Sequence, residues 1–328
     1  MQLLVVMPSK YLGNMVISLQ TIRALIEGNG AQDTTLLIDQ GFVELVGLVT
    51  GDAHRLLVFP RKRQGALGRL GRLLLHLRRH RYDCVLDLDG TVISARIVSL
   101  AKARRKVGPQ FAKRTAVYTE VVANERDVQH CFEDFALMSE AIGIPLQNRD
   151  YARLPELADT GLPLDLDSKM ACIHPSATKD YKQWDIHKFA ELADWLTEHG
   201  YTPVIVGAGA AEASRVARLV QLMRHPPMNM FGQLSLLQLI ELCQRSRVFI
   251  GNDSGPMHLA AASGTTTIAL FGPTELLRWK PRATNAITLK GPAPCSPDCR
   301  PEACLRNYQC LTSLDTDQVK AAILSNTG

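Results

Sequence analysis

The sequence predicts an α/β protein made of two doubly wound domains, because strand-length apolar runs alternate with helical patterns in two successive series. A chain of 328 residues is also long for a single core, since domains usually hold roughly 100 to 200 residues. Hydrophobic residues make up 46% of the chain and charged residues 21%, which allows two sizeable cores. We therefore expect parallel sheets covered by helices on both faces.

The first series begins at residues 3–7, an apolar run of strand length that leads through a polar turn into a helix. Apolar residues in that helix recur at helical spacing from Met15 to Ile26, and the glycines at 28–30 end it. Further strands are expected at residues 35–38, 55–59 and 84–88.

Residues 154–169 are rich in Pro, Gly, Asp and Leu, have no steady period and indicate a linker. We place the boundary there, which gives an N-terminal domain of residues 1–157 and a C-terminal domain of residues 158–328. The final helix either completes the second domain or packs back on the first. The second series is expected to hold strands ending at 173 and at 202–206, 247–251 and 265–270, and helices at 185–199, 218–223, 236–244 and 316–324.

The chain shows no signal for export or for a membrane span. Its N-terminus is apolar but lacks a basic region and reaches Pro8 and Lys10 too early for a signal peptide. No apolar run approaches the ~18 residues that a span requires. We therefore expect a cytoplasmic protein whose eight cysteines are reduced thiols.

Basic residues gather in two acid-free stretches, although the net charge is only +5. Residues 55–81 carry nine Lys or Arg, and residues 91–119 carry seven. Such clusters suit a phosphate-bearing partner: an anionic lipid headgroup, a phosphorylated glycan or nucleic acid. The segment 69–81 equally fits a solvated helix face. No nucleic-acid motif is present, so nucleic acid is not expected as the partner.

The most informative segment, residues 247–275, reads RVFIGNDSGPMHLAAASGTTTIALFGPTE. A strand runs into Asp253, Ser254 and Gly255, and Pro256 stands where a helix begins, with Ser254 as its expected cap. The backbone N–H groups and the dipole at that helix start favour a diphosphate. Gly255 allows a phosphate oxygen to approach closely, and His258, one turn later, can donate a hydrogen bond. Taken alone, such a turn is also a common helix entry.

The full string closely resembles the signature of glycosyltransferase family 9, the ADP-heptose:lipopolysaccharide heptosyltransferases. In that signature an aspartate, a hydroxyl residue and a glycine precede a helix that bears Met-His-Leu or a similar triplet, and a Phe-Gly-Pro-Thr turn follows. The resemblance implies a GT-B type fold, in which two Rossmann-like domains face a central cleft. It also implies donor contacts from Asp253, Ser254, Gly255 and His258.

Other segments match the family in the same order along most of the chain. Residues 174–177 and 182–184, HPSA and KQW, resemble a loop in which hydroxyl residues and a lysine meet the donor phosphates. The resemblance implies donor contacts from Ser176 and Lys182, whereas Trp184 is expected to be a core anchor. Glu212 aligns with an acid used on the donor nucleoside, and Leu234 with an apolar segment that borders adenine.

The N-terminal domain departs from the family at Gly13-Asn14, where the family usually has Gly-Asp. The family's aspartate resembles a general base that takes the proton of the acceptor hydroxyl. An amide has no useful basicity, so Asn14 can only orient the acceptor. Either Asp87 or Asp89, the nearest carboxylates, substitutes for the family's aspartate, or the enzyme is slow or uses an acceptor that needs less help. Asp89 before Gly90 fits a turn-forming residue better than a catalytic one.

The family resemblance also assigns the acceptor contacts to the basic residues of the first domain. Arg61, Lys62, Arg63 and Arg114 match positions where the family meets the acidic groups of its acceptor. Arginine binds carboxylate or phosphate through two parallel hydrogen bonds. We therefore expect an anionic glycolipid acceptor, the lipopolysaccharide core, and peripheral contact with the inner membrane.

Four cysteines near the C-terminus, Cys295, Cys299, Cys304 and Cys310, have the spacing C-x3-C-x4-C-x5-C. Four thiolates can hold zinc, but the tight C-x2-C knuckle is missing, so no metal is expected.

Together these features predict an inverting glycosyltransferase that moves heptose from ADP-heptose to the lipopolysaccharide core and requires no cofactor. Two alternatives stay open at this point. Because Asn14 replaces the usual Asp, the chain could be a non-catalytic nucleotide-sugar-binding accessory protein. It could also be a sugar-nucleotide epimerase or hydrolase, because the same fold serves those activities.

Overall fold

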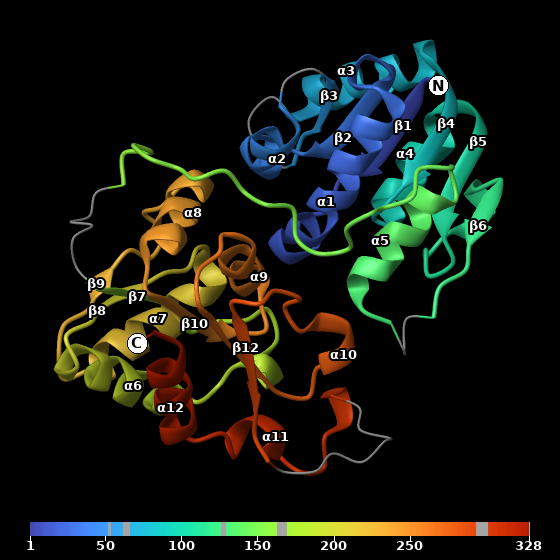
Figure 1. Ribbon diagram of the computed structural model, residues 1–328. Coiled ribbons are helices and arrows are strands. Elements are labelled where there is room, and N and C mark those ends of the chain that lie inside the picture. Colours follow the sequence, from blue (N-terminus) through green and yellow to red (C-terminus); the bar gives the residue numbers. More distant parts are fainter. Residues whose placement is uncertain (52–53, 62–65, 126–128, 163–168, 293–300, 328) are drawn as a thin grey trace. The chain divides into compact units, whose positions relative to one another are not determined.

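In the computed structural model, the chain divides into two compact units, Met1–Pro155 and Glu156–Gly328. The structure describes residues 1–51, 54–61, 66–125, 129–162, 169–292 and 301–327. Each unit holds one six-stranded sheet, and every strand pair in both sheets is parallel (Figure 1). This is the doubly wound α/β architecture that the sequence predicts.

The sheet of the first unit has the strand order β3-β2-β1-β4-β5-β6. At its centre, Val5 of β1 pairs with Leu36 of β2 on one side and with Leu86 of β4 on the other. All five residues of β1 are buried, because helices cover both faces of the sheet. The strands are β1 (Leu3–Met7), β2 (Thr34–Asp39), β3 (Arg55–Phe59), β4 (Arg81–Asp87), β5 (Lys102–Pro109) and β6 (Glu120–Val122).

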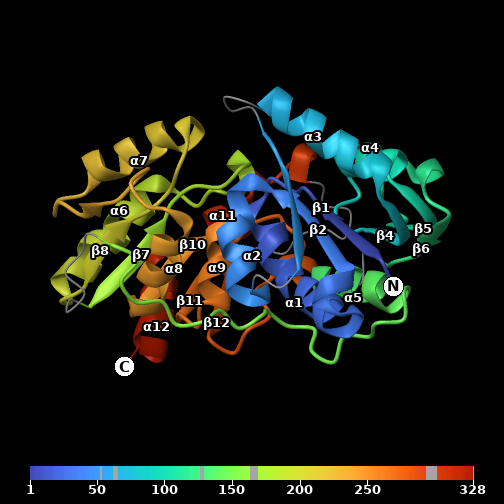
Figure 2. The ribbon, with the colours of Figure 1, turned by 90° about the horizontal axis from the view of Figure 1, so that it is seen from above.

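Helices pack on both sides of this sheet. Leu73 and Leu77 of α3 (Ala66–Arg79), together with Val98 of α4 (Val92–Leu100), form one core with strand residues of alternating positions. The helices on the other side in Figure 2 are α1 (Leu12–Asn29), α2 (Val43–Thr50) and α5 (Cys131–Glu140).

The sheet of the second unit has the strand order β12-β11-β10-β7-β8-β9. Ile173 of β7 pairs with Ile250 of β10 on one side and with Ile205 of β8 on the other. The strands are β7 (Met170–His174), β8 (Thr202–Ile205), β9 (Met228–Asn229), β10 (Val248–Asn252), β11 (Thr267–Phe271) and β12 (Ala286–Lys290).

Two cores sandwich this second sheet. On one face Phe189, Leu219 and Ile323 pack around Ile173, and on the other face Met257 joins a separate cluster. The helices of the first face are α6 (Ile186–Glu198), α7 (Ala210–Leu222) and α12 (Thr316–Thr327). Those of the second face are α8 (Leu236–Arg245), α9 (Gly255–Ala262) and the short α10 (Leu276–Trp279), and α11 (Gln309–Thr312) precedes α12.

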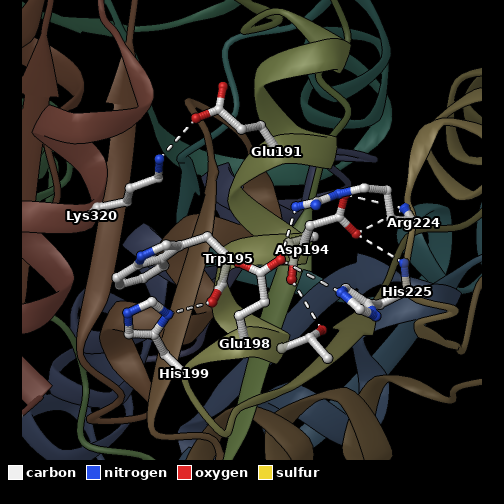
Figure 3. A network of polar contacts seen from close by, with 10 residues as sticks. Glu191, Asp194, Trp195, Glu198, His199, Arg224, His225 and Lys320 are labelled. Atoms are coloured by element: carbon white, nitrogen blue, oxygen red, sulfur yellow. Dashed lines mark hydrogen bonds and ion pairs between the residues drawn. The ribbon is translucent and has the colours of Figure 1, made fainter.

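A buried carboxylate on α6 anchors the segment that follows α7. Asp194 accepts hydrogen bonds from the backbone N–H groups of Arg224 at 2.9 Å and His225 at 3.0 Å (Figure 3). Burial raises the pKa of Asp194, but these bonds and the Arg224 guanidinium lower it further than burial raises it. Glu198 also pairs with Arg224, at 2.9 Å. These contacts serve the fold, and no residue in this network is a predicted site residue.

The sequence predicts the position of most buried strands but misses four others. β3 has the bounds expected from the sequence, and α6 and α8 differ from their expected ranges by a residue at one or both ends. The missed strands are β5, β6, β9 and β12. Basic residues at exposed positions of β5, such as Arg104 and Arg105, hide its pattern, and β9 has only two residues. The N-terminal half of α7 was also missed, because its alanines and Glu212 carry no apolar period.

Each sheet has one point where the chain reverses its direction of winding. That point lies between β1 and β4 in the first unit and between β7 and β10 in the second. In doubly wound sheets, ligands bind beyond the carboxyl ends of the strands at this point. Within the described ranges, no helix is long and apolar enough to cross a bilayer.

Candidate functional site

The second unit gathers most of its predicted donor residues at the point between β7 and β10. Ser176 and Lys182 follow β7, while Asp253, Ser254 and Gly255 follow β10. Because β7 and β10 are parallel neighbours, both loops emerge at the same edge of the sheet. His174 and Ser254, which are 80 positions apart in the chain, therefore contact each other there.

An ion pair links the two loops. Lys182 Nζ lies 2.7 Å from Asp253 Oδ2, and the Asp253 side chain is 5% exposed while that of Lys182 is 23% exposed. A nearly buried carboxylate needs such a partner, because an unpaired buried charge is costly. The ammonium group is consequently held at the start of α9, where the helix dipole also favours an anion.

His174, the last residue of β7, joins the β10 loop to α7. Its Nδ1 lies 3.2 Å from the Ser254 hydroxyl and its Nε2 lies 3.3 Å from the Glu212 carboxylate. A carboxylate can only accept, so Nε2 carries the proton, and in the neutral ring Nδ1 then accepts from Ser254. The sequence does not reveal this role of His174. The three residues lie on β7, on α7 and in the loop after β10, which are far apart in the chain.

Ser254 is therefore not the side-chain cap that the sequence predicts. It occupies the N-cap position of α9 with extended backbone, but its hydroxyl makes no capping hydrogen bond and contacts His174 instead. Pro256 lies in the first turn as expected, and His258 is buried one turn into the helix. The first N–H groups of a helix have no partner within the helix, so the α9 start keeps donors for an anion.

Glu212 and the glycine turn before it also fit together closely. A Cβ on Gly207, whose φ is +153°, would lie 2.7 Å from Glu212 Oε2, so a larger residue would displace the carboxylate. Burial raises the pKa of Glu212, but its bonds with His174 and with the Ala208 N–H lower it overall. Leu234 lies in the loop before α8 and packs against the core beneath α8 and α9.

Asn252 and Arg215 fix the loop after β7, and neither was predicted. The fully buried Asn252 amide donates to the Pro175 carbonyl at 2.8 Å and accepts from the Trp184 N–H at 2.9 Å. Arg215 donates to the carbonyls of Pro175 and Trp184. Trp184 itself is fully buried and is the core anchor that the sequence predicts.

Two buried hydroxyls in this unit have no hydrogen-bond partner among the described residues, Ser176 Oγ and Thr274 Oγ1. Ser176 is 1% exposed and lies in the predicted donor loop, and Thr274 lies in the turn after β11. An unsatisfied buried hydroxyl costs stability, and such a group in a native protein calls for an explanation. Ligand binding by Ser176 would supply one.

In the first unit, Gly13 and Asn14 lie in the first turn of α1, directly after β1. Asp89 follows β4, the neighbour of β1, so it emerges at the same edge of the sheet. Burial raises the pKa of Asp89, whereas hydrogen bonds from Thr91 and Ser9 and the charge of Arg61 act in the opposite direction. This edge therefore holds a partly buried carboxylate close to the loop that leads to Asn14.

Asp87, the other candidate carboxylate, is hydrogen-bonded within the first unit. It is fully buried, and its Oδ2 accepts from the Tyr118 hydroxyl at 2.7 Å. Its Oδ1 accepts from the N–H groups of Asp89 at 2.9 Å and Gly90 at 3.0 Å. Asp87 thus closes the turn that the sequence assigns to Asp89. Burial raises the pKa of Asp87 to about 6.

Of the four basic residues predicted to bind the acceptor, the structure describes Arg61 and Arg114. Arg61 donates to the Pro8 carbonyl at 2.7 Å and forms an ion pair with Asp39 at the end of β2. Arg114 is exposed, in a segment whose Lys113 N–H bonds the Gly90 carbonyl. Both arginines therefore lie at the carboxyl edge of the first sheet. Lys62 and Arg63 are outside the described residues.

The cysteine cluster is only partly described. Cys295 and Cys299 lie outside the described residues, whereas Cys304 is half-buried and Cys310 is buried. Within the part of the chain that the structure covers, no group of His, Cys, Asp or Glu is arranged to hold a metal.

Comparison with known proteins now decides the family. The model of glycosyltransferase family 9 (heptosyltransferase) matches residues 70–309. This chain belongs to glycosyltransferase family 9. It is therefore a glycosyltransferase, and the resemblance seen in residues 247–275 is confirmed.

Individual members of family 9 are similar over about two thirds of their length. The chain is 28% identical to the lipopolysaccharide core heptosyltransferase OpsX of Haemophilus influenzae over 72% of this chain and 70% of that one. It is 30% identical to lipooligosaccharide heptosyltransferase 2 of Campylobacter jejuni over 68% and 76% of the two chains. With lipopolysaccharide heptosyltransferase 3 of Escherichia coli it shares 27% identity over 66% of each chain.

Solved structures of glycosyltransferases share the fold of this chain, with its two doubly wound α/β units. The E. coli ADP-heptose lps heptosyltransferase II superposes with a TM-score of 0.79 at 20% identity, over 100% of both chains. The glycosyl transferase family 9 structure from Veillonella parvula gives a TM-score of 0.83 at 19% identity, over 99% of this chain and 98% of that one. E. coli heptosyltransferase WaaC with ADP gives 0.72 at 19% identity, over 99% of both.

Proposed function

We propose that this chain transfers a heptose from ADP-heptose to an acceptor hydroxyl of the lipopolysaccharide core, with inversion at the anomeric carbon. The observation that carries the proposal is the convergence of Ser176, Lys182, Asp253 and Ser254 at one edge of the second sheet. Members of the same family are named lipopolysaccharide heptosyltransferases, and one solved relative is described with ADP.

In the proposed donor site, the diphosphate lies at the start of α9. Lys182 and the first N–H groups of the helix stabilise the negative charge that develops on the departing ADP, in place of an obligatory metal. Gly255 leaves room for a phosphate oxygen, and Ser176 and His258 supply further hydrogen bonds. Glu212 contacts the nucleoside, and Leu234 borders the adenine.

In the proposed acceptor site, the edge of the first sheet supplies the base and the positive charge. The acceptor hydroxyl attacks the anomeric carbon, the bond from that carbon to the diphosphate oxygen breaks, and the hydroxyl proton passes to Asp89. Asp89 is favoured over Asp87, because Asp87 is fully buried and already accepts three hydrogen bonds. Asn14 and Gly13 orient the acceptor.

The anionic acceptor is held by arginines at the same edge. Arg61 and Arg114 meet its carboxylates or phosphates, and Lys62 and Arg63 are assigned the same role from the family resemblance alone. Because this acceptor is a membrane glycolipid, we place the protein in the cytoplasm, in peripheral contact with the inner membrane.

The test is a transfer assay with ADP-heptose and isolated lipopolysaccharide core. The proposal predicts release of ADP together with a new glycosidic bond of inverted configuration, which NMR of the product would show. Release of ADP without any acceptor would instead indicate a hydrolase, and epimerised donor would indicate an epimerase. Nucleotide binding without turnover would favour an accessory protein, as the replacement of the usual Asp by Asn14 suggests.

A further inference from the structure

Helix α3 carries an outward face that the fold does not use. Leu73 and Leu77 point into the core and are 5% and 0% exposed. Leu75, on the opposite side, is 47% exposed, and Leu67, near the start of the helix, is 86% exposed. Leucines at such positions contribute nothing to the core and leave apolar surface in contact with water.

The charges around these leucines all have one sign. Residues 72, 78 and 79 are arginines, which stand three and four positions from Leu75 and therefore surround it on the helix surface. All three are exposed, and none forms an ion pair with any residue that the structure describes. No acidic residue occurs anywhere from Arg55 to Arg81.

Small residues keep this face open. Gly71 lies one turn before Leu75 and Gly68 almost two turns before it, on the same side of the helix. A Cβ added to either glycine would meet no atom within 4 Å, so nothing in the described structure covers them. Exposed leucines flanked by arginines on one helix face are typical of helices that lie in the plane of an anionic membrane surface.

The position of α3 connects this face with the proposed acceptor site. In a β-α unit the helix starts at the carboxyl edge of the sheet, where Arg61 lies just before α3. Arg69 in the first turn of α3 bonds the Gln40 side chain at 3.2 Å, and Gln40 directly follows β2 at that edge. The exposed Leu67 is therefore at the same end of the first sheet as Asp89 and Arg114. In Figure 2, α3 lies on the side of this sheet opposite α1.

We propose that the outer face of α3, formed by Leu67, Leu75, Arg72, Arg78 and Arg79, docks on an anionic lipid surface. The leucines enter the headgroup region and the arginines contact lipid phosphates. The leucines favour lipid over nucleic acid, because a nucleic-acid backbone offers no apolar layer to receive them. The inference deepens the proposed function, on which it rests for its lipid-linked acceptor, but the binding itself is independent of catalysis.

The test is co-sedimentation of the full chain with phosphatidylcholine vesicles that contain or lack phosphatidylglycerol. We expect binding only to the anionic vesicles. The double variant Arg72→Gln, Arg79→Gln should bind them roughly 25-fold more weakly, since each arginine near such a surface contributes roughly fivefold. Leu67→Ser with Leu75→Ser should weaken binding at least about tenfold, because apolar burial is lost.

Matched variants control for charge and surface polarity elsewhere. Arg153→Gln with Arg218→Gln removes two exposed arginines outside α3, and Leu324→Ser changes a leucine that is 57% exposed on α12. These should bind vesicles like the wild type. Equal losses in the control and α3 variants would overturn the proposal, as would an unchanged leucine variant.

Two further measurements separate this proposal from the proposed function. ADP titration should give the same affinity for every variant. A chain that binds vesicles but not ADP would contradict the donor assignment and leave the proposed docking of α3 in place. A chain that binds ADP but no vesicles would contradict the docking of α3 and leave the donor assignment in place. Binding of a labelled oligonucleotide in place of vesicles would identify a different partner and overturn the lipid assignment.

Discussion

Lys182 Nζ and Asp253 Oδ2 lie 2.7 Å apart, although the two residues are separated by 71 positions in the chain. The pair joins the loop after β7 to the loop after β10, at the point where the winding of the second sheet reverses. It therefore places a positive charge beside the α9 start, where the proposed site binds the donor diphosphate.

Replacing Lys182 by Ala should remove the charge that stabilises the leaving diphosphate. We expect turnover to fall about 100-fold, because preorganised donors at a developing charge contribute several kcal/mol. Nucleotide affinity should fall as well. Steady-state kinetics and ADP titration measure the two effects.

Lys179→Ala is the matched control, because Lys179 is exposed and lies three residues before Lys182. It should leave both quantities unchanged. Thermal unfolding must accompany the Lys182 variant, since Asp253 loses its partner there. Unaltered turnover in a folded Lys182→Ala protein would remove this residue from the mechanism.

The buried hydroxyl of Ser176 should contribute to ADP binding and lower the free energy of unfolding of the unliganded protein. Because this group has no described partner, Ser176→Ala should raise the free energy of unfolding by about 1 kcal/mol. The same change should weaken ADP binding about tenfold, since a hydrogen bond to a charged phosphate is lost. Chemical denaturation and calorimetry measure the two quantities.

Thr274→Val is the control for Ser176, since it removes the other unpartnered hydroxyl. It should be comparably stabilising without altering ADP affinity. A Ser176→Ala protein that is more stable and binds ADP as the wild type does would show that this hydroxyl plays no part in the donor site.

The proposed base is tested by exchanging acid and amide at two positions. Asp89→Asn should lower kcat about 100-fold or more while ADP affinity stays constant, because only proton removal is lost. In the wild type, kcat should decline as pH drops through the pKa of Asp89, which burial raises, and this step should vanish in the variant. A variant with normal kcat and the same pH profile would contradict the assignment.

Asn14→Asp provides the complementary test. If the chain has lost its base, restoring the family's carboxylate at this position should switch turnover on in an inactive protein. If Asp89 already serves, the Asp89→Asn protein should be rescued in part by Asn14→Asp. No recovery in either background would mean that position 14 has no access to the acceptor hydroxyl.

Asp87 should make stability depend on pH. Burial raises the pKa of Asp87 from 3.8 to about 6, so the folded state favours the protonated form. Its contribution is fully present below pH 3.8 and is lost as pH rises through about 6. At ~1.4 kcal/mol per pKa unit, the loss amounts to about 3 kcal/mol.

The measurement is the free energy of unfolding of the wild type and of Asp87→Asn at a series of pH values. Relative to the variant, the wild type should lose stability as the pH rises between about 4 and 6. A constant difference across this range would show that Asp87 does not titrate with the raised pKa.

Local patterns in the sequence predict the fold well, because strand and helix periodicity is visible wherever residues are buried. Met15 to Ile26 and residues 186–198 lie in helices as expected. β5, β6, β9 and β12 were missed, because exposed basic residues interrupt the apolar pattern of β5 and because β6 and β9 hold only three and two residues. The helix start at Pro256 also followed from local chemistry alone.

The site was predicted only in part, because several of its contacts depend on distant segments. The roles of His174, Asn252 and Arg215 follow from a sheet that brings β7, β10 and α7 together, and no motif spacing reveals them. The cap assigned to Ser254 was wrong for the same reason, since His174 takes up its hydroxyl. At the other sheet, the turn assigned to Asp89 is closed by Asp87, whose burial the sequence does not show.

Calorimetric titration of the purified chain with ADP, UDP and GDP tests the proposed donor site most directly. We expect a clear preference for ADP, and a marked loss of that binding in Lys182→Ala. Preference for UDP or GDP would contradict the assigned donor while leaving the family membership in place. Absence of binding to all three nucleotides would contradict the donor site itself.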